Sequence, residues 1–456
     1  MKASRSSGGA PVLVGIVSLG CAKNLVDTEV MLGHLERAGA SFVQDPAEAE
    51  VLVVNTCGFI EAAREESIRA ILEAAEHKVT GRLKRLVVAG CLVQRYPREM
   101  RESLPEVDDW IGLDELDQVV RAVASGRREA LGAPAVAVPS AYLYDHATPR
   151  RLATPPWTAF VKIAEGCDHT CSFCAIPSFR GAFRSRPIDD IVLEAEALAR
   201  SGVREIGLIS QDTSDYGRDL GQRDGLPRLL ERLDAVGELR WIRLHYLYPN
   251  SVTPLLVDAM ARLEKVVEYV DLPLQHAHPA MLRRMRRGGS AEGHLALVER
   301  FRAAMPGAAL RTTLIVGFPG ETEEEFGALL AFVAEARFDH LGAFTYSHED
   351  GTRAFALDDD VPPEAKEERR ERLMVLQQGI AFRRNEGRIG SRVELLVEGV
   401  HPETEHLLVG RTRGQALDVD GQVLVNDGAA PAGTFATAEI SDTAGYDLVA
   451  RIVDAP

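Results

Sequence analysis

Short apolar runs alternate with amphipathic stretches over the first part of the chain. Residues 12–17, 51–54 and 86–89 are β-branched or apolar runs typical of buried strands, and residues 26–38 and 61–77 have helical spacing. Strands that alternate with helices indicate a parallel sheet covered by helices. We therefore expect an α/β fold whose N-terminal domain, residues 11–130, is a doubly wound parallel sheet.

A second strand–helix series follows a stretch without periodicity. Residues 131–156 are rich in Ala, Pro, Ser and Thr, which is typical of a linker. Candidate strands then lie at 159–164, 205–210, 240–246, 266–272, 310–316 and 341–346, with helical stretches between them and a charged amphipathic helix at 363–386. Six units are too few for an eight-stranded barrel, so a partial (β/α)6 barrel is predicted over residues 157–387.

The end of the chain, residues 388–456, changes character again. Short candidate strands at 392–400, 407–412, 416–419, 422–425 and 434–440 are separated by turns rich in Gly, Pro and Asp. This pattern predicts a small closed β-barrel.

Composition and charge narrow the class of protein. A chain of 456 residues with 46% hydrophobic and 26% charged residues has the composition of a globular enzyme of two or three domains. The absence of a run of 18 apolar residues argues against a membrane span, so we expect a cytoplasmic protein with no membrane partner. The formal net charge of −16 disfavours a phosphate backbone and favours a basic partner.

Three of the six cysteines crowd into the segment after the candidate strand at 159–164. Cys167, Cys171 and Cys174 form a C-x-x-x-C-x-x-C pattern that brings three thiolates around one centre. A cubic iron–sulfur cluster has four irons, so three cysteines leave one iron open to another ligand. The alternative is a structural zinc site made of these cysteines and His169.

The other three cysteines are far apart in the sequence, but each follows a candidate strand. Cys21, Cys57 and Cys91 stand after the runs near residues 15–19, 51–54 and 86–89. The carboxyl ends of parallel strands open on one edge of the sheet, where ligands bind. One such cysteine alone would be a buried core residue, but the threefold coincidence predicts a second three-cysteine cluster.

The C-x-x-x-C-x-x-C stretch resembles the signature of the radical S-adenosylmethionine superfamily. The resemblance implies that Cys167, Cys171 and Cys174 bind a 4Fe-4S cluster whose open iron is chelated by S-adenosylmethionine. It also implies that Phe173 packs near the adenine and that the loop containing Gly317 and Phe318 lies near the adenosine. That loop has a local role as well, because Thr322 and Glu325 predict a capping box for the next helix.

The whole arrangement resembles the methylthiotransferase family, whose terminal barrel is a TRAM domain. This resemblance implies insertion of a methylthio group at a C–H bond with two 4Fe-4S clusters, two molecules of S-adenosylmethionine and an electron donor such as flavodoxin or ferredoxin. The cluster held by Cys21, Cys57 and Cys91 would present a methylated sulfur to the carbon radical, and the resemblance leaves the source of that sulfur open. No catalytic His or Asp is expected; His245, Tyr248, His276 and His278 are candidates either to line the cavity or to pack structurally.

Two branches of that family differ in substrate. One modifies an adenosine in transfer RNA (MiaB-type), and the other modifies an aspartate at its β-carbon in small-subunit ribosomal protein S-twelve (RimO-type). The stretches 17–27, 244–249, 273–276 and 446–448 resemble the second branch. We therefore expect the ribosomal protein as partner, with the transfer RNA enzyme and a non-catalytic iron–sulfur or zinc protein as alternatives.

Local charge favours the same branch. Residues 388–456 hold five basic and eleven acidic residues, a net charge of −6, which suits a basic protein better than RNA. The only dense basic run, Arg283–Arg287 with Met285 inside it, is expected to be a solvated helix end and not a nucleic-acid contact.

Overall fold

The computed structural model describes residues 11–124 and 138–455. They form two compact units: unit 1 runs to Ala153 and also includes Ala175–Ala182, and unit 2 consists of Thr154–Cys174 and the chain from Phe183 onward. Part of the expected linker, residues 131–137, lies outside the described residues. The domain boundaries expected at residues 130, 156 and 387 stay predictions.

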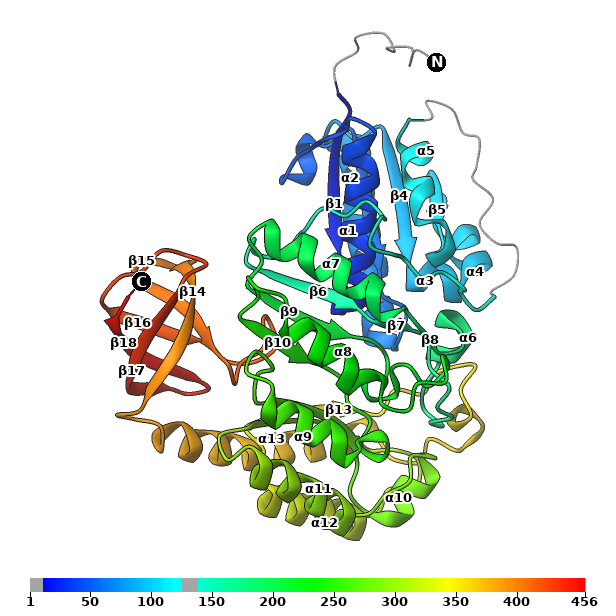
Figure 1. The fold of residues 1–456 in the computed structure, drawn as a ribbon. Coiled ribbons are helices and arrows are strands. Elements are labelled where there is room, and N and C mark those ends of the chain that lie inside the picture. Colours follow the sequence, from blue (N-terminus) through cyan, green and yellow to red (C-terminus); the bar gives the residue numbers. More distant parts are fainter. Residues whose placement is uncertain (1–10, 125–137, 456) are drawn as a thin grey trace. The chain divides into compact units, whose positions relative to one another are not determined.

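Unit 1 is built on a five-stranded parallel sheet in the order β2-β1-β3-β4-β5 (Figure 1). Its strands are β1 (Leu13–Ser18), β2 (Ser41–Phe42), β3 (Val51–Thr56), β4 (Arg85–Gly90) and β5 (Asp109–Ile111). Its helices are α1 (Ala22–Arg37), η1 (Pro46–Glu48), α2 (Glu61–Thr80), α3 (Cys91–Arg95), α4 (Pro97–Ser103), η2 (Leu113–Gln118), α5 (Val119–Ala124) and α6 (Ile176–Arg180).

The sheet of unit 1 has a separate hydrophobic layer on each face. Val51 and Val53 of β3 belong to the cluster that includes Met31 of α1, whereas Leu52 and Val54 belong to the cluster that includes Ile71 of α2. Alternate residues of a strand point to opposite faces, so one apolar strand supplies both layers. The predicted doubly wound sheet is confirmed.

The core of unit 2 consists of two three-stranded parallel sheets, β10-β9-β6 and β11-β12-β13, and a parallel bridge between Ile242 and Val266 lies between them. The strands are β6 (Thr158–Lys162), β9 (Glu205–Ile209), β10 (Trp241–Leu244), β11 (Tyr269–Gln275), β12 (Ala309–Val316) and β13 (His340–Thr345). Two short antiparallel strands, β7 (Ala164–Glu165) and β8 (Arg184–Ser185), flank the cysteine segment. The predicted partial (β/α)6 barrel is confirmed.

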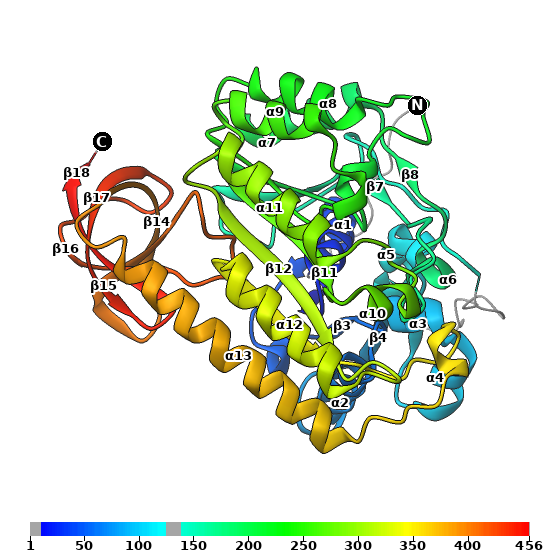
Figure 2. The same ribbon diagram turned by 90° about the horizontal axis from the view of Figure 1, so that it is seen from below.

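Helices follow the strands of this core in sequence and flank them (Figure 2). They are α7 (Ile188–Arg200), η3 (Thr213–Asp215), α8 (Gly225–Asp234), η4 (Pro249–Ser251), α9 (Pro254–Arg262), α10 (Pro279–Arg284), α11 (Ala291–Ala304), α12 (Glu323–Ala336), η5 (Ala354–Ala356) and α13 (Pro363–Glu386). The last helix has the bounds predicted from its amphipathic pattern. Among the described residues no helix combines the length and the apolar character that crossing a membrane requires.

The C-terminal part of unit 2 is a closed barrel in the order β14-β15-β16-β18-β17, as predicted. Its strands are β14 (Arg392–His401), β15 (Thr404–Thr412), β16 (Val423–Asp427), β17 (Phe435–Ala444) and β18 (Asp447–Asp454). Two expectations were wrong in detail. Residues 416–419 form a turn, in which Asp418 has a φ of 60° and the Asp420 carboxylate accepts the Ala416 N–H, and the strand β18 was not expected.

A buried ion-pair network joins this barrel to the core strands of the same unit. The Arg411 guanidinium lies 2.6 Å from the Glu205 carboxylate at the start of β9, and Arg243 of β10 lies 2.8 Å from the other Glu205 oxygen. Burial opposes ionisation of Glu205, but the two arginines lower its pKa to about 2. The barrel is therefore fixed to the amino-terminal ends of the core strands.

Candidate active site

In unit 1 the structure brings together the three thiols that follow neighbouring strands. Cys21 precedes α1 after β1, Cys57 follows β3, and Cys91 begins α3 directly after β4. Burial raises the pKa of Cys57, and the charge of Cys21 adds to this shift. Burial also raises the pKa of Cys91 to about 12, and the charges of Cys57 and Cys21 add to it. The Cys91 thiol lies 3.8 Å from the Asn24 Oδ1, and Asn24 is three residues after Cys21. That the three sulfurs hold one cluster at this edge of the sheet stays a prediction of the strand-end argument.

Cys21 differs from the other two thiols. The residue as a whole is exposed, but its sulfur is buried, and burial alone would raise the pKa of the thiol. The positive charges of Lys23 and Arg180 outweigh the effect of burial, so the pKa of the Cys21 thiol is lowered. Metals bind the thiolate form of cysteine, and the nearby positive charges favour the thiolate form of Cys21.

A glycine makes room for the sulfurs. Gly20 has a φ of 91°, and a Cβ at this position would lie 2.9 Å from the Cys57 Cβ and 3.3 Å from its Sγ. Only glycine adopts this backbone conformation without strain and leaves the space beside the Cys57 thiol open. Three thiol sulfurs, with open space left beside one of them by Gly20, are suitable ligands for an iron–sulfur cluster.

Arg180 reaches the same sulfurs from α6. Its Nη2 lies 3.0 Å from the Cys91 Sγ and 3.0 Å from the Asp27 carboxylate of α1, and its side chain is 3% exposed. Sequence reasoning missed Arg180. The available signal was a charged residue in the apolar segment that follows the cysteine motif.

The second trio lies in unit 2 on the loop after β7. Burial is the largest cause that raises the pKa of Cys167 to about 12, and the charges of Asp212 and Cys171 add to it. Cys171 is buried, and the Cys174 N–H donates to its carbonyl at 3.2 Å. The raised pKa keeps the Cys167 thiol protonated at neutral pH, so binding of a metal to this sulfur releases its proton.

Arg287 places a positive charge beside this trio. Its Nη1 lies 3.5 Å from the Cys171 Sγ, and its guanidinium lies 4.4 Å from the centre of the Tyr248 ring. Arg283 and Arg286 are exposed as expected, but Arg287 is 8% exposed. The expectation of a solvated helix end was therefore wrong for Arg287, because the chain turns at Arg286, which has a φ of 54°.

His169 does not stand free beside the cysteines. Its Nε2 lies 2.6 Å from the Asp212 carboxylate, and its ring stacks on Tyr248 with 3.8 Å between the ring centres. Ligand atoms of His169, Asp212 and Asp215 all lie within 4.8 Å of one another. These groups already bond within the protein, since Asp212 caps η3 and Asp215 pairs with Arg218 at 3.0 Å.

The loop after β12 carries the residues expected near adenosine. Gly317 has a φ of 72°, and the Phe318 side chain is fully buried in a cluster with Met281 and Tyr346, against which Phe173 packs. The structure thus brings Phe173 and Phe318 together. The predicted capping box is confirmed, since the Thr322 Oγ1 accepts the Glu325 N–H at 3.2 Å and the Glu325 carboxylate accepts the Thr322 N–H at 2.9 Å.

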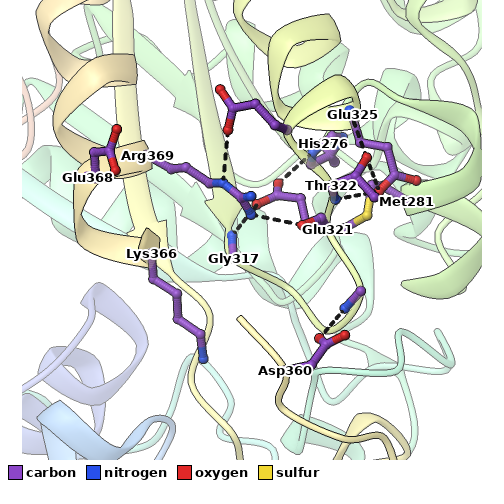
Figure 3. Close-up of polar contacts among 12 residues, drawn as sticks. His276, Met281, Gly317, Glu321, Thr322, Glu325, Asp360, Lys366, Glu368 and Arg369 are labelled. Carbon is purple, nitrogen blue, oxygen red and sulfur yellow. Dashed lines mark hydrogen bonds and ion pairs between the residues drawn. The ribbon is translucent and has the colours of Figure 1, made fainter. Parts of the chain in front are cut away.

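One buried carboxylate, Glu321, holds this loop in place (Figure 3). It accepts the Gly317 N–H at 2.6 Å, an Arg369 N–H at 2.7 Å and a bond to His276 Nε2 at 3.0 Å. The His276 Nδ1 accepts the His278 N–H, so the proton of a neutral His276 lies on Nε2 and is donated to Glu321. His276 therefore acts here as part of the loop support.

His245 and Tyr248 also have structural partners. Burial is the largest cause that lowers the pKa of His245 to about 3, and the positive charge of Arg243 adds to it, so His245 is neutral near pH 7. The Tyr248 hydroxyl donates to the Arg287 carbonyl at 2.8 Å. Both positions are accounted for by packing within unit 2.

Comparisons with known proteins agree with these features. The family described as "Uncharacterized protein family UPF0004" matches residues 13–112, the radical SAM superfamily matches residues 161–333, and the TRAM domain matches residues 389–453. The "Ribosomal protein uS12 methylthiotransferase RimO" of Anaeromyxobacter sp. (strain K) is 51% identical over 96% of this chain and 92% of the relative. Its namesake in Myxococcus xanthus is 47% identical over 98% of this chain and 93% of that relative.

A solved structure shows the same fold at low identity. The radical S-adenosylmethionine methyltransferase TsrM from Kitasatospora setae, with cobalamin and a [4Fe-4S] cluster bound, superposes with a TM-score of 0.51 at 16% identity. The match covers 74% of this chain and 75% of that chain.

Proposed function

This chain belongs to the RimO family of ribosomal protein uS12 methylthiotransferases, which are radical S-adenosylmethionine enzymes, and we propose that it inserts a methylthio group at the β-carbon of an aspartate in that ribosomal protein. The observation that carries the proposal is the division of all six cysteines into two sets of three. Three thiolates per cubic cluster leave one iron for an exogenous ligand, and two such sites match a reaction with a radical step and a sulfur-insertion step.

The proposed ligands are Cys167, Cys171 and Cys174 for the radical-generating cluster and Cys21, Cys57 and Cys91 for the second cluster. When bound, the clusters and S-adenosylmethionine supply a one-electron cleavage that yields a hydrogen-abstracting radical, together with a sulfur for insertion. An external one-electron donor such as flavodoxin or ferredoxin is part of the proposal, as is action in the cytoplasm.

The protein's own residues bind and orient the reactants. Phe173 and the backbone of Gly317 and Phe318 are the proposed contacts of S-adenosylmethionine, and Glu321 fixes their loop through the Gly317 N–H. No general base is required for hydrogen-atom abstraction, so orientation and exclusion of water are the tasks left to the protein.

The charge of the C-terminal barrel supports a basic protein substrate over RNA. Of its five basic residues, Arg411 is buried against Glu205 and Glu398, and Arg413 and Arg451 pair with Glu268 and Glu439. The exposed acidic residues of the barrel are Glu403, Glu405, Asp418, Asp427, Asp442 and Asp454. A surface that binds phosphates needs accessible basic side chains, and this barrel presents few.

The test is a direct comparison of substrates. The anaerobically reconstituted protein is incubated with S-adenosylmethionine, a reductant and either ribosomal protein uS12 or transfer RNA, and each product is analysed by mass spectrometry. We expect one methylthio group on an aspartate of the protein and none on the RNA. Modification of the RNA alone would replace the proposal with the MiaB-type function.

Cysteine variants separate the two proposed sites. Cys171→Ala is expected to abolish formation of 5′-deoxyadenosine, whereas Cys57→Ala is expected to retain it and to block sulfur insertion. Metal analysis of each variant should give the iron of one cluster and no zinc. Zinc without iron, or continued cleavage by Cys171→Ala, would contradict the assignment and favour a non-catalytic metal protein.

A further inference from the structure

Each trio of cysteines has one buried arginine directed at one of its sulfurs. In unit 1, Arg180 donates to the Cys91 Sγ at 3.0 Å. In unit 2, Arg287 donates to the Cys171 Sγ at 3.5 Å. The two arginines are 3% and 8% exposed, so neither side chain extends into solvent, where arginine is usually found.

We propose that Arg180 and Arg287 are the resident counter-charges of the two three-cysteine sites, each raising the reduction potential of the cluster that its own trio binds. This inference rests on the proposed cluster ligation. Hydrogen bonds to sulfur and local net charge are two of the protein's means of setting the potential of an iron–sulfur cluster, and a buried arginine supplies both.

Charge balance within unit 1 supports the role of Arg180. The Asp27 carboxylate, whose side chain is 2% exposed, lies 3.0 Å from Arg180, and a bound cluster would add three thiolates to this negative charge. Arg180 bonds to both kinds of anion with the same nitrogen, whereas Lys23 acts on Cys21 through its charge. Removal of the guanidinium would leave the carboxylate and thiolates without this compensation, which is costly in a buried site.

The surroundings of Arg287 supply an independent observation. Its Nη2 donates to the Pro273 carbonyl and its plane lies over the Tyr248 ring, so the guanidinium is fixed from two sides. Its Nε is buried and has no hydrogen-bond partner among the described residues. A buried donor without a partner beside Cys171 fits a site that receives a further acceptor when its anionic ligand is bound.

The sign of the effect follows from electrostatics. Reduction adds one negative charge to a cluster, and a nearby positive charge stabilises the reduced form more than the oxidised form. Arg180→Gln should therefore lower the potential of the cluster in unit 1, and Arg287→Gln should lower that of the cluster in unit 2. Lysine at either position keeps the charge and should retain most of the potential.

The experiment isolates one cluster at a time in the full-length protein. A background with Cys167, Cys171 and Cys174 changed to alanine leaves the unit 1 site, and a background with Cys21, Cys57 and Cys91 changed to alanine leaves the unit 2 site. Iron content is measured first, and midpoint potentials are then obtained by redox titration followed by electron paramagnetic resonance. The matched control is Arg85→Gln, which removes a buried ion pair with Asp109 at the opposite end of β4 from Cys91.

The outcomes distinguish the inference from its premise. In the unit 1 background we expect a lower potential for Arg180→Gln, a potential near the wild-type value for Arg180→Lys, and no shift for Arg85→Gln. If Arg180→Gln takes up no iron while Arg180→Lys does, the counter-charge is needed for loading, which also supports the inference.

Equal potentials for wild type and Arg180→Gln, or equal losses in the Gln and Lys variants, would overturn the inference and leave the cysteine assignment intact. Absence of iron from a background that retains its three cysteines would instead overturn the proposed function. Circular dichroism spectra of the variants show whether a loss of iron reflects unfolding.

Discussion

Replacement of Glu321 by glutamine tests whether the loop at Gly317 is held in a binding-competent form by one carboxylate. All three partners of Glu321 are donors: the Gly317 N–H, the Arg369 guanidinium and His276 Nε2. A glutamine has a single acceptor oxygen, so in either orientation its NH₂ group faces at least one of these donors. Glu321→Gln keeps the shape of the side chain and removes this complementarity.

The size of the effect follows from the bonds that are lost. A hydrogen bond that involves a charged group contributes about 1.5–3 kcal/mol. If this free energy is lost entirely from the loop at Gly317, a smaller fraction of molecules holds the loop in the conformation that binds S-adenosylmethionine. The apparent affinity for S-adenosylmethionine then falls in proportion to that fraction. We expect the Kd for S-adenosylmethionine to rise ~10- to ~100-fold.

Equilibrium dialysis or calorimetry of the anaerobically reconstituted variant measures this Kd, and iron content is determined on the same sample. Glu323→Gln is the matched control, because Glu323 lies two residues further on, at the start of α12, with its side chain 61% exposed. The reasoning is refuted if Glu321→Gln binds S-adenosylmethionine with wild-type affinity, or if Glu323→Gln weakens binding equally.

Stability and cluster loading provide three more expectations. Glu205→Gln leaves two buried arginines without their shared carboxylate and should lower the free energy of unfolding by about 3–5 kcal/mol, measured by denaturant unfolding of the apo protein. Burial is the main cause that lowers the pKa of His294 to about 4, so below pH 6.5 the unfolded chain binds a proton that the folded chain does not. Stability should therefore fall by about 2 kcal/mol between pH 8 and pH 5, and His294→Leu should flatten that part of the pH profile. Gly20→Ala places a Cβ 2.9 Å from the Cys57 Cβ at a φ of 91°, and the iron content of the reconstituted protein should fall toward that of one cluster.

Features that depend on short stretches of sequence could be predicted well. The capping box of Thr322 and Glu325 and the bounds of α13 need only neighbouring residues, and both are confirmed. The turn at residues 416–419 was predicted as a strand because a short apolar run has the same pattern in both forms. What decides between them is a contact with Asp420 and the packing of Ala416 against Trp241, which the run itself does not reveal.

The cysteines and the arginines mark the limit of sequence reasoning at the candidate site. Cys21, Cys57 and Cys91 could be expected to meet because a topological rule brings the ends of parallel strands to one edge. Arg180 and Cys91 are 89 positions apart, and Arg287 and Cys171 are 116 apart. No periodicity or motif joins such pairs, so an arginine beside a thiol looks the same in the sequence as one in solvent.

The excess of carboxylates in this chain makes the thiol partners of Arg180 and Arg287 unusual. In a chain with 52 basic and 68 acidic residues, most arginines of unit 2 pair with carboxylates, as Arg186 does with Asp190 and Glu194. Arg287, in contrast, is directed at a carbonyl, a ring and a thiol, and Arg180 divides its Nη2 between a carboxylate and a thiol. A thiol is a weak acceptor for a buried cation, whereas a cluster-bound thiolate is a strong one. The positions of both arginines are thus explained better by the metal-bound form of each trio than by the free thiols.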